Sequence, residues 1–132
     1  MKFHHVGIFV RSLESGKLHL NTMIPNLVWS GVTDDHALKV SVQFASAADG
    51  LTYELVAPNG PNNPVANSLS KRVNILNHIA FKADDFDSTN QYLIEDCSAI
   101  PVSPPMPAVA FGGKRVRFYL NKLGFITELI EA

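Results

Sequence analysis

The sequence contains the same unusual phrase twice, 73 positions apart. The two copies are FHHVGIFV at 3–10 and LNHIAFKA at 76–83. Each places a histidine, His5 or His78, two residues after an apolar residue and two residues before a small one. The copies superpose without a gap, and a fixed period of this kind indicates that one structural module occurs twice.

Each copy continues with the same predicted order of elements. A β-rich run is followed by a residue that commonly begins helices, Ser12 in the first copy and Asp85 in the second, and then by a helical pattern. The residues expected to pack inward from these helices are Leu13, Leu18 and Leu20 in the first copy and Phe86, Tyr92 and Leu93 in the second. Strands are then expected at 27–32, 37–46 and 51–57 in the first copy, and at 99–102, 107–111, 114–120 and 125–131 in the second.

Turn signals separate these strands. Asp34-Asp35 and Asp49-Gly50 are expected to form turns in the first copy, and Gly112-Gly113 to form one in the second. The stretch 59–74 is rich in Asn, Pro and Ser and is expected to be a connecting loop. We therefore predict a single α+β domain over 1–132, with a first βαβββ module at about 1–58, a linker at 59–74 and a second module at about 75–132.

The last strand of each module carries a glutamate at a matching position. TYELVAP contains Glu54, which follows His5 by 49 positions, and ITELIEA contains Glu128, which follows His78 by 50. The two intervals differ by only one residue, so the repeat extends across the whole module. Each module is therefore expected to begin on a histidine strand and end on a glutamate strand.

Three of these polar residues lie on apolar strand faces. Alternate residues of a strand share a face. Their neighbours are Phe3 and Gly7 for His5, Leu76 and Ala80 for His78, and Ile126 and Ile130 for Glu128. Burying a carboxylate in such surroundings is costly without a partner. If the modules pack with approximate two-fold symmetry, His5, Glu54, His78 and Glu128 converge, and this donor set suits one divalent ion such as Zn, Ni, Co or Mn.

Composition excludes several classes of partner. Eleven basic and twelve acidic residues give a formal net charge of −1, so no general nucleic-acid binding is expected. No apolar run approaches the roughly 20 residues of a membrane span, and the start MKFHH does not resemble a signal peptide. The single cysteine, Cys97, allows no internal disulfide, which fits a reducing compartment. We expect a cytoplasmic protein with a small-molecule substrate.

The motifs HVGI at 5–8, ELVAP at 54–58, HIAF at 78–81 and ELIE at 128–131 resemble those of the vicinal oxygen chelate superfamily. This superfamily includes glyoxalase I, methylmalonyl-CoA epimerase, extradiol dioxygenases and fosfomycin- and bleomycin-resistance proteins. The resemblance covers nearly the whole chain and is specific in the combination of motifs. It implies that two βαβββ modules form a cupped, partly open mixed β-barrel around a metal, and that the protein is a homodimer. The family's metal ligands carry over to His5, Glu54, His78 and Glu128.

The complete His/Glu/His/Glu set favours one branch of the superfamily. It resembles glyoxalase I, and the epimerases are similar, often with Gln at the second position. Dioxygenases leave the position of Glu54 outside the ligand set, and bleomycin-type binders lack the set. We therefore expect a metal-dependent lyase or isomerase that moves a proton next to a carbonyl, with Glu128 as the base. The alternatives are a metal-free drug- or metabolite-binding protein and an Fe(II) extradiol dioxygenase.

Four further residues are candidate substrate contacts. Related epimerases carry an additional Glu on an inner strand of the first module, and the matching position here is Ser41, with Gln43 close by. The strand-one Arg of glyoxalases corresponds to Phe9. Phe111 is a candidate lining residue. The missing acid and the missing arginine are departures from both branches, so the resemblance does not name the substrate.

Overall fold

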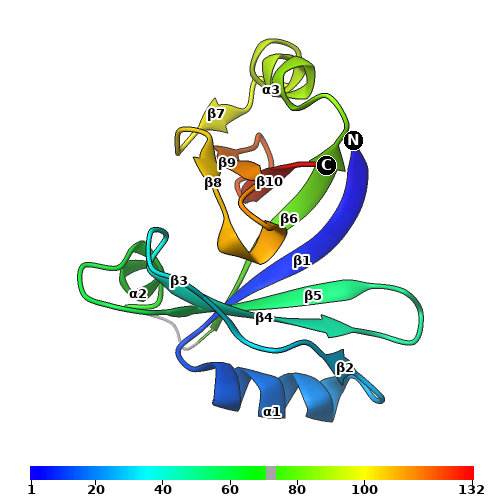
Figure 1. Cartoon of the computed structure of the whole chain (residues 1–132), viewed down its shortest axis with the longest axis vertical. Helices are drawn as coiled ribbons and strands as arrows, with labels where there is room; N and C mark the ends of the chain where they lie inside the picture. The colour runs from blue at the N-terminus through cyan, green and yellow to red at the C-terminus, as the bar shows by residue number, and fades with distance from the viewer. Residues whose placement is uncertain (71–73) are drawn as a thin grey trace. The chain divides into compact units, whose positions relative to one another are not determined.

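The computed structural model of the chain describes residues 1–70 and 74–132 (Figure 1). It divides into two compact units, which we describe separately. The N-terminal unit is Val6–Leu76, and the C-terminal unit is Met1–His5 together with Asn77–Ala132. The division falls inside the first strand, Lys2–Val10, and again inside the strand Asn74–Ala83, so each of these strands contributes residues to both units.

Four strands lie wholly within the described part of the N-terminal unit, beside the part of β1 (Lys2–Val10) that belongs to it. They are β2 (Val28–Trp29), β3 (Thr33–Asp35), β4 (Val40–Ser46) and β5 (Thr52–Pro58). The strands are ordered β2-β4-β5-β1, and β3 also pairs with β4. β5 runs parallel to β1 and antiparallel to β4. Its helices are α1 (Leu13–Met23) and α2 (Pro64–Ser68).

Helix α1 begins where the sequence predicts it. The Ser12 hydroxyl accepts a hydrogen bond from the Ser15 backbone N–H at 3.2 Å, which satisfies one of the amide groups left unpaired at a helix start. Gly16 is buried on the inner face of the helix, beside Val10 and Leu55 in the unit's hydrophobic core. The absence of a side chain at Gly16 therefore permits close contact between α1 and the sheet.

We expect Gly16→Ala to lower the free energy of unfolding by about 1 kcal/mol, although alanine is the better helix former by about 1 kcal/mol. The new Cβ would lie 2.9 Å from Val10 Cγ1 and 3.2 Å from Leu55 Cδ1, which is too close for a packed core. Gly31→Ala is the control, because a Cβ there meets no atom within 4 Å. Urea unfolding of both variants measures the effect, and a stabilised Gly16→Ala protein would contradict this packing.

The C-terminal unit repeats the same plan with shorter outer strands. Its elements are β6 (Asn74–Ala83), α3 (Phe86–Glu95), β7 (Ile100–Pro101), β8 (Met106–Pro107), a 3-10 turn η1 (Val109–Phe111), β9 (Arg115–Leu120) and β10 (Ile126–Glu131). The order is β6-β10-β9-β7, with β8 also paired to β9. β10 runs parallel to β6 and antiparallel to β9. As predicted, the Asp85 carboxylate caps α3 by accepting from the Ser88 N–H at 2.9 Å.

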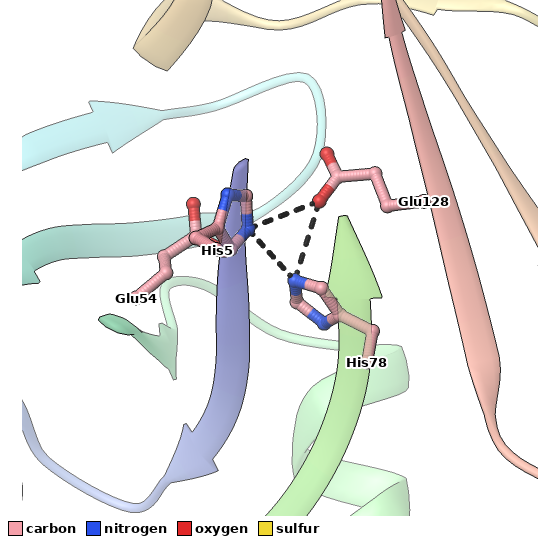
Figure 2. Close-up of side chains that lie close together, drawn as sticks. All are labelled: His5, Glu54, His78 and Glu128. Carbon is pink, nitrogen blue, oxygen red and sulfur yellow. Dashed lines mark hydrogen bonds and ion pairs between the residues drawn. The ribbon is translucent and has the colours of Figure 1, made fainter. Parts of the chain in front are cut away.

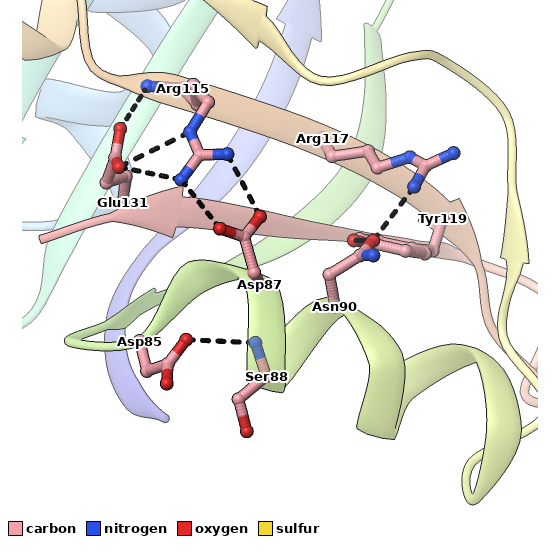
Figure 3. Close-up of polar contacts among 8 residues, drawn as sticks. All are labelled: Asp85, Asp87, Ser88, Asn90, Arg115, Arg117, Tyr119 and Glu131. Carbon is pink, nitrogen blue, oxygen red and sulfur yellow. Dashed lines mark hydrogen bonds and ion pairs between the residues drawn. The ribbon is translucent and has the colours of Figure 1, made fainter.

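Polar contacts fasten α3 to the sheet of this unit (Figure 3). The Arg115 guanidinium donates to Glu131 on β10 at 2.9 Å and to Asp87 on α3 at 3.0 Å. Hydrogen bonds from Arg115 hold the pKa of the Glu131 carboxyl below its usual range. The Tyr119 hydroxyl donates to Asn90 Oδ1 at 2.6 Å. These bonds position α3 over β9 and β10.

The predicted α+β fold with two tandem βαβββ modules is confirmed, and the partly open mixed β-barrel expected from the resemblance is an open mixed sheet in the described residues. Hydrogen bonding connects the described strands in the order β2-β4-β5-β1-β6-β10-β9-β7, and the sheet does not close. In each half, the first and last long strands are parallel neighbours. The limits proposed for the modules, and the single domain over 1–132, stay predictions. Residues 71–73 of the proposed linker lie outside the described residues.

Several predicted elements were wrong in detail. The strand expected at 107–111 is instead a short strand ending at Pro107, followed by the turn η1, because Gly112 and Gly113 adopt positive φ angles of 65° and 83° that close a turn. Asp34-Asp35 lies in β3 rather than in a turn, and the chain reverses at 36–39, where Lys39 has a φ of 57°.

The predicted linker and two predicted core positions also need correction. Helix α2 lies within 59–74 because Asn63 caps it and Pro64 occupies its first turn. Leu18 is 67% exposed and Tyr92 is 49% exposed, so neither belongs to the core. The inner faces of α1 and α3 use Gly16 with Leu20, and Phe86 with Leu93, at the spacing of a helix.

Candidate metal centre

Two histidines and one glutamate meet inside the C-terminal unit. His5 lies on β1, His78 on β6 and Glu128 on β10. The Nε2 atoms of the two histidines are 3.2 Å apart, and Glu128 Oε2 lies 3.3 Å from His5 Nε2 and 3.2 Å from His78 Nε2 (Figure 2). The three atoms therefore form a nearly equilateral triangle, as three donors to one ion would.

The triangle is withdrawn from water. His5 is 0% exposed, and His78 and Glu128 are each 3% exposed. Glu128 Oε2 is buried, and apart from its contacts with the two imidazole nitrogens it has no hydrogen-bond partner among the residues that the structure describes. A buried carboxylate oxygen with no hydrogen-bond donor is costly, and a cation satisfies it directly.

The strand register explains why Glu128 faces the histidines. Glu128 pairs with Ala80 on the parallel side and with Phe118 on the antiparallel side. Ala80 is two residues beyond His78 on β6, so the side chains of His78, Ala80 and Glu128 share one face of the sheet. The small side chain of Ala80 leaves room for the carboxylate beside the imidazole.

Glu54 has the same surroundings in the N-terminal unit. It is 5% exposed on β5, where it pairs with Gly7 of β1 on the parallel side and with Phe44 of β4 on the antiparallel side. Gly7 and Ala80 are equivalent residues of the repeat, as are Phe44 and Phe118 with a slip of one position. The repeat seen in the sequence thus extends to the hydrogen-bonding partners of both glutamates.

Aromatic rings enclose the histidines. Phe111 of η1 is stacked on the His5 ring, with centroids 6.1 Å apart and an interplanar angle of 18°. Phe118 meets the His78 ring edge-on at 6.3 Å. The rings keep the imidazole faces out of water, so the electrostatic interactions of the donor atoms are stronger than they would be in an exposed site.

The size of the triangle fits a small divalent ion. Four donors at about 2.0–2.1 Å from a tetrahedral zinc are about 3.3–3.4 Å apart, and octahedral donors at similar bond lengths are about 3.0 Å apart. The observed separations of 3.2–3.3 Å lie between these limits and close to the first. Two imidazole nitrogens and a carboxylate oxygen are also suitable donors for zinc and its neighbours in the transition series.

The chain matches a protein-family model over most of its length. The matching model is described as the Glyoxalase/Bleomycin resistance protein/Dioxygenase superfamily, and it covers residues 4–118. The chain belongs to this superfamily. The resemblance inferred from the four sequence motifs is therefore confirmed, while no curated protein sequence matches the chain significantly.

Solved structures of this superfamily's fold resemble the chain along its full length. A hypothetical protein from Bacillus halodurans is 23% identical with a TM-score of 0.84, covering 99% of this chain and 94% of its own. Methylmalonyl-CoA epimerase from Mycobacterium tuberculosis is 19% identical with a TM-score of 0.81, covering 98% and 87%. A variant of the Streptomyces coelicolor methylmalonyl-CoA epimerase, bound to 2-nitronate-propionyl-CoA, is 20% identical with a TM-score of 0.80, covering 100% and 97%. At these identities the likeness shows the fold.

Two of the candidate substrate-contact residues lie on the face of the sheet opposite to Glu54. Ser41 and Gln43 alternate with Phe44, the partner of Glu54, and so occupy the opposite face of β4. Ser41 donates to Asp34 Oδ1 at 2.6 Å, and Gln43 donates to the Ser30 carbonyl at 2.8 Å. Their contact with a substrate stays a prediction. Their placement on the face opposite to Glu54 does not favour it. β4 also contains no acidic residue on either face.

Of the other two candidates, Phe9 lies on a strand face that carries a proposed metal ligand, and Phe111 lies in the turn η1. Phe9 pairs with Val56 and shares the face of Gly7 and Glu54. Phe111 lies against His5. Substrate contact by either residue stays a prediction, as do a homodimer and a cytoplasmic location. None of the helices in the described parts of this superfamily member is long and apolar enough to cross a membrane.

The sequence did not reveal the contacts of His4 and Asn77. The side chains of adjacent strand residues normally diverge, yet the Nδ1 atoms of His4 and His5 are 2.8 Å apart. Asn77 Oδ1 lies 2.8 Å from His78 Nδ1. One signal was available, because the 73-residue offset of the repeat places Asn77 on His4.

Proposed function

We propose that this protein is a metal-dependent isomerase or lyase of the glyoxalase/methylmalonyl-CoA epimerase type. Its substrate would be a small acyl thioester or α-oxygenated carbonyl compound, from which it moves a proton on the carbon next to the carbonyl. The observation that carries the proposal is the buried triangle of His5 Nε2, His78 Nε2 and Glu128 Oε2. A site of this composition inside a superfamily member is suited to binding one divalent ion.

We propose Glu54 as the fourth ligand. β1 is one continuous strand, so His5 and Gly7 share a face, and Glu54 is the parallel partner of Gly7. In the other repeat, the same register brings Glu128 to within 3.2 Å of His78. Two carboxylates would also neutralise the charge of a divalent ion. Zn, Ni, Co and Mn all remain compatible with this ligand set.

Glu128 is the proposed general base. When bound, the divalent ion would supply Lewis-acid stabilisation of the negative charge that develops on the substrate oxygen. Glu128 has one carboxylate oxygen in the triangle, and its second oxygen is available on the same group to accept a proton from the substrate carbon. Phe111 and Phe118, by enclosing the imidazoles, keep the site dry during this transfer.

Proton transfer by a single base and epimerisation both belong to the proposed reaction class, but they need different numbers of acid–base residues. A single base suffices when one carboxylate both removes and returns the proton, whereas epimerisation also needs a proton donor on the opposite face of the substrate carbon. The strand β4, where related epimerases carry that second acid, has none in this chain. The Streptomyces coelicolor neighbour was solved with an acyl-CoA analogue, which makes acyl-CoA thioesters the first substrates to test.

The test is deuterium exchange from solvent into a panel of acyl-CoA thioesters and hemithioacetals, monitored by NMR with the metal-loaded protein. We expect exchange at the carbon next to the carbonyl in at least one compound. No exchange in any compound would remove the proton-transfer proposal. Oxygen consumption with a catechol and Fe(II) would instead indicate a dioxygenase, and binding of small molecules without any metal would indicate a sequestering protein.

A further inference from the structure

We propose that His4 and Asn77 are positioning residues for the metal site. Each holds the Nδ1 atom of the histidine that follows it in sequence, so that both Nε2 atoms are directed at the ion. The inference rests on the proposed function, because it assumes that His5 and His78 are ligands. It assigns a role to two residues that do not themselves bind the ion.

The Asn77 contact supports the tautomer of His78 that an ion requires. Asn77 Oδ1 is 2.8 Å from His78 Nδ1, and an amide oxygen can only accept a hydrogen bond. When His78 Nε2 binds an ion, the single N–H of the neutral ring lies on Nδ1, where Asn77 Oδ1 is placed to accept it. This leaves the Nε2 lone pair directed at the triangle, where His5 Nε2 and Glu128 Oε2 both lie 3.2 Å away.

The His4 contact does the same for His5 by a different group. The Nδ1 atoms of His4 and His5 are 2.8 Å apart, so one of them donates and the other accepts. If His5 Nε2 is to bind an ion, its proton must lie on Nδ1, and His4 Nδ1 must be the acceptor. His4 is then the neutral tautomer with its own proton on Nε2.

Phe111 secures this pair of rings. It meets the His4 ring edge-on at 5.7 Å and is stacked on the His5 ring at 6.1 Å. The near-perpendicular angle of 81° between the His4 and His5 rings is thus supported from one side by a third ring. The 3-10 turn that carries Phe111 exists because Gly112 and Gly113 turn the chain after it.

The repeat argues that the arrangement is not accidental. His4 and Asn77 are equivalent positions in the two modules, and different side chains make the same contact at the same ring atom. Nδ1 is the imidazole nitrogen nearer to the main chain. It is therefore within reach of the preceding residue's side chain while Nε2 extends toward the site. Partners of this kind orient ligand histidines and typically change metal affinity by about 10–100-fold.

Two variants remove these contacts while keeping the shape of the side chain. Asn77→Leu is nearly isosteric and lacks the acceptor, and Asn77→Asp restores an acceptor oxygen. His4→Phe keeps an aromatic ring against Phe111 but has no ring nitrogen. His36→Phe is the matched control, because His36 is exposed in the N-terminal unit. Thermal unfolding of the full chain identifies any variant that fails to fold.

The first readout is the Nδ1–H proton of each ligand histidine in the zinc-loaded protein, measured at one pH by 1H–15N correlation NMR. We expect the Nδ1–H protons of His5 and His78 to exchange slowly with water, because each nitrogen lies 2.8 Å from its partner. Asn77→Leu should speed the exchange of the His78 proton, and Asn77→Asp should restore slow exchange. Equal exchange rates in Asn77→Leu and in the original protein would contradict the role of Asn77.

The second readout is zinc affinity by competition with a chromophoric chelator. We expect a loss of about 10–100-fold in Asn77→Leu and in His4→Phe, no such loss in Asn77→Asp, and no change in His36→Phe. If the original protein binds zinc and the two altered proteins bind it equally well, the positioning role is wrong and the proposed function stands. If the original protein binds none of Zn, Ni, Co and Mn, the proposed function fails.

Discussion

Replacing Glu128 with Gln should reduce solvent deuterium exchange into the substrate by about 10²–10⁴-fold, the range typical for loss of a general base. The amide keeps the size of the side chain but cannot accept a proton from carbon. The comparison is made with metal-saturated proteins, since Glu128 Oε2 is also one corner of the triangle. Exchange rates are followed by NMR on whichever acyl thioester or hemithioacetal the original protein accepts.

Glu131→Gln is the control for this experiment. Glu131 is on the same strand, three residues further along, so its side chain lies on the opposite face from Glu128. It is bonded to Arg115 rather than to the histidines. This variant should keep its exchange rate. Glu128→Gln with an unchanged rate would show that another group removes the proton, even if the metal is bound as proposed.

Replacing His78 with Ala should weaken zinc binding by more than 100-fold, exceeding the roughly 10–100-fold effect of losing an outer hydrogen-bond partner. His78 contributes one of the three donor atoms, and its removal opens the buried triangle on one side. A ligand that binds only the folded state raises the unfolding temperature. We therefore expect zinc to raise the unfolding temperature of the original protein and to leave that of His78→Ala nearly unchanged.

His19→Ala provides the matched control, because His19 is an exposed histidine of α1. It should respond to zinc as the original protein does. The metal-free His78→Ala protein should fold, because the substitution removes a polar group that is costly to bury. A full zinc response in His78→Ala would mean that zinc binds elsewhere and that the triangle is only a buried polar cluster.

The sequence predicted the fold well because its strongest signal was the repeat. One offset aligned His5 with His78, and the register of β5 on β1 and of β10 on β6 then followed the same rule. The helix starts at Ser12 and Asp85 were predictable because capping depends on local side chains. The grouping of His5, His78 and Glu128 was predictable because polar residues on apolar strand faces need partners.

The errors share a physical cause, which is that tertiary packing decided them. Leu18 was expected in the core, but the buried stripe of α1 runs through Gly16 and Leu20, where the helix approaches Val10 most closely. The strand expected through 107–111 ends early because the two glycines adopt a conformation that sequence patterns do not specify. The contact of His4 with His5 depends on ring orientation, which strand alternation alone does not determine.

Metal content is the most direct test of whether His5, His78 and Glu128 form a divalent-ion site. Protein purified without chelators should contain close to one divalent ion per chain by mass spectrometry. The metal-free chain should take up one equivalent of zinc, and X-ray absorption should show two imidazole nitrogens among the donors. A chain that holds no ion and takes none up at micromolar zinc would contradict the account, leaving a duplicated fold with a buried polar cluster.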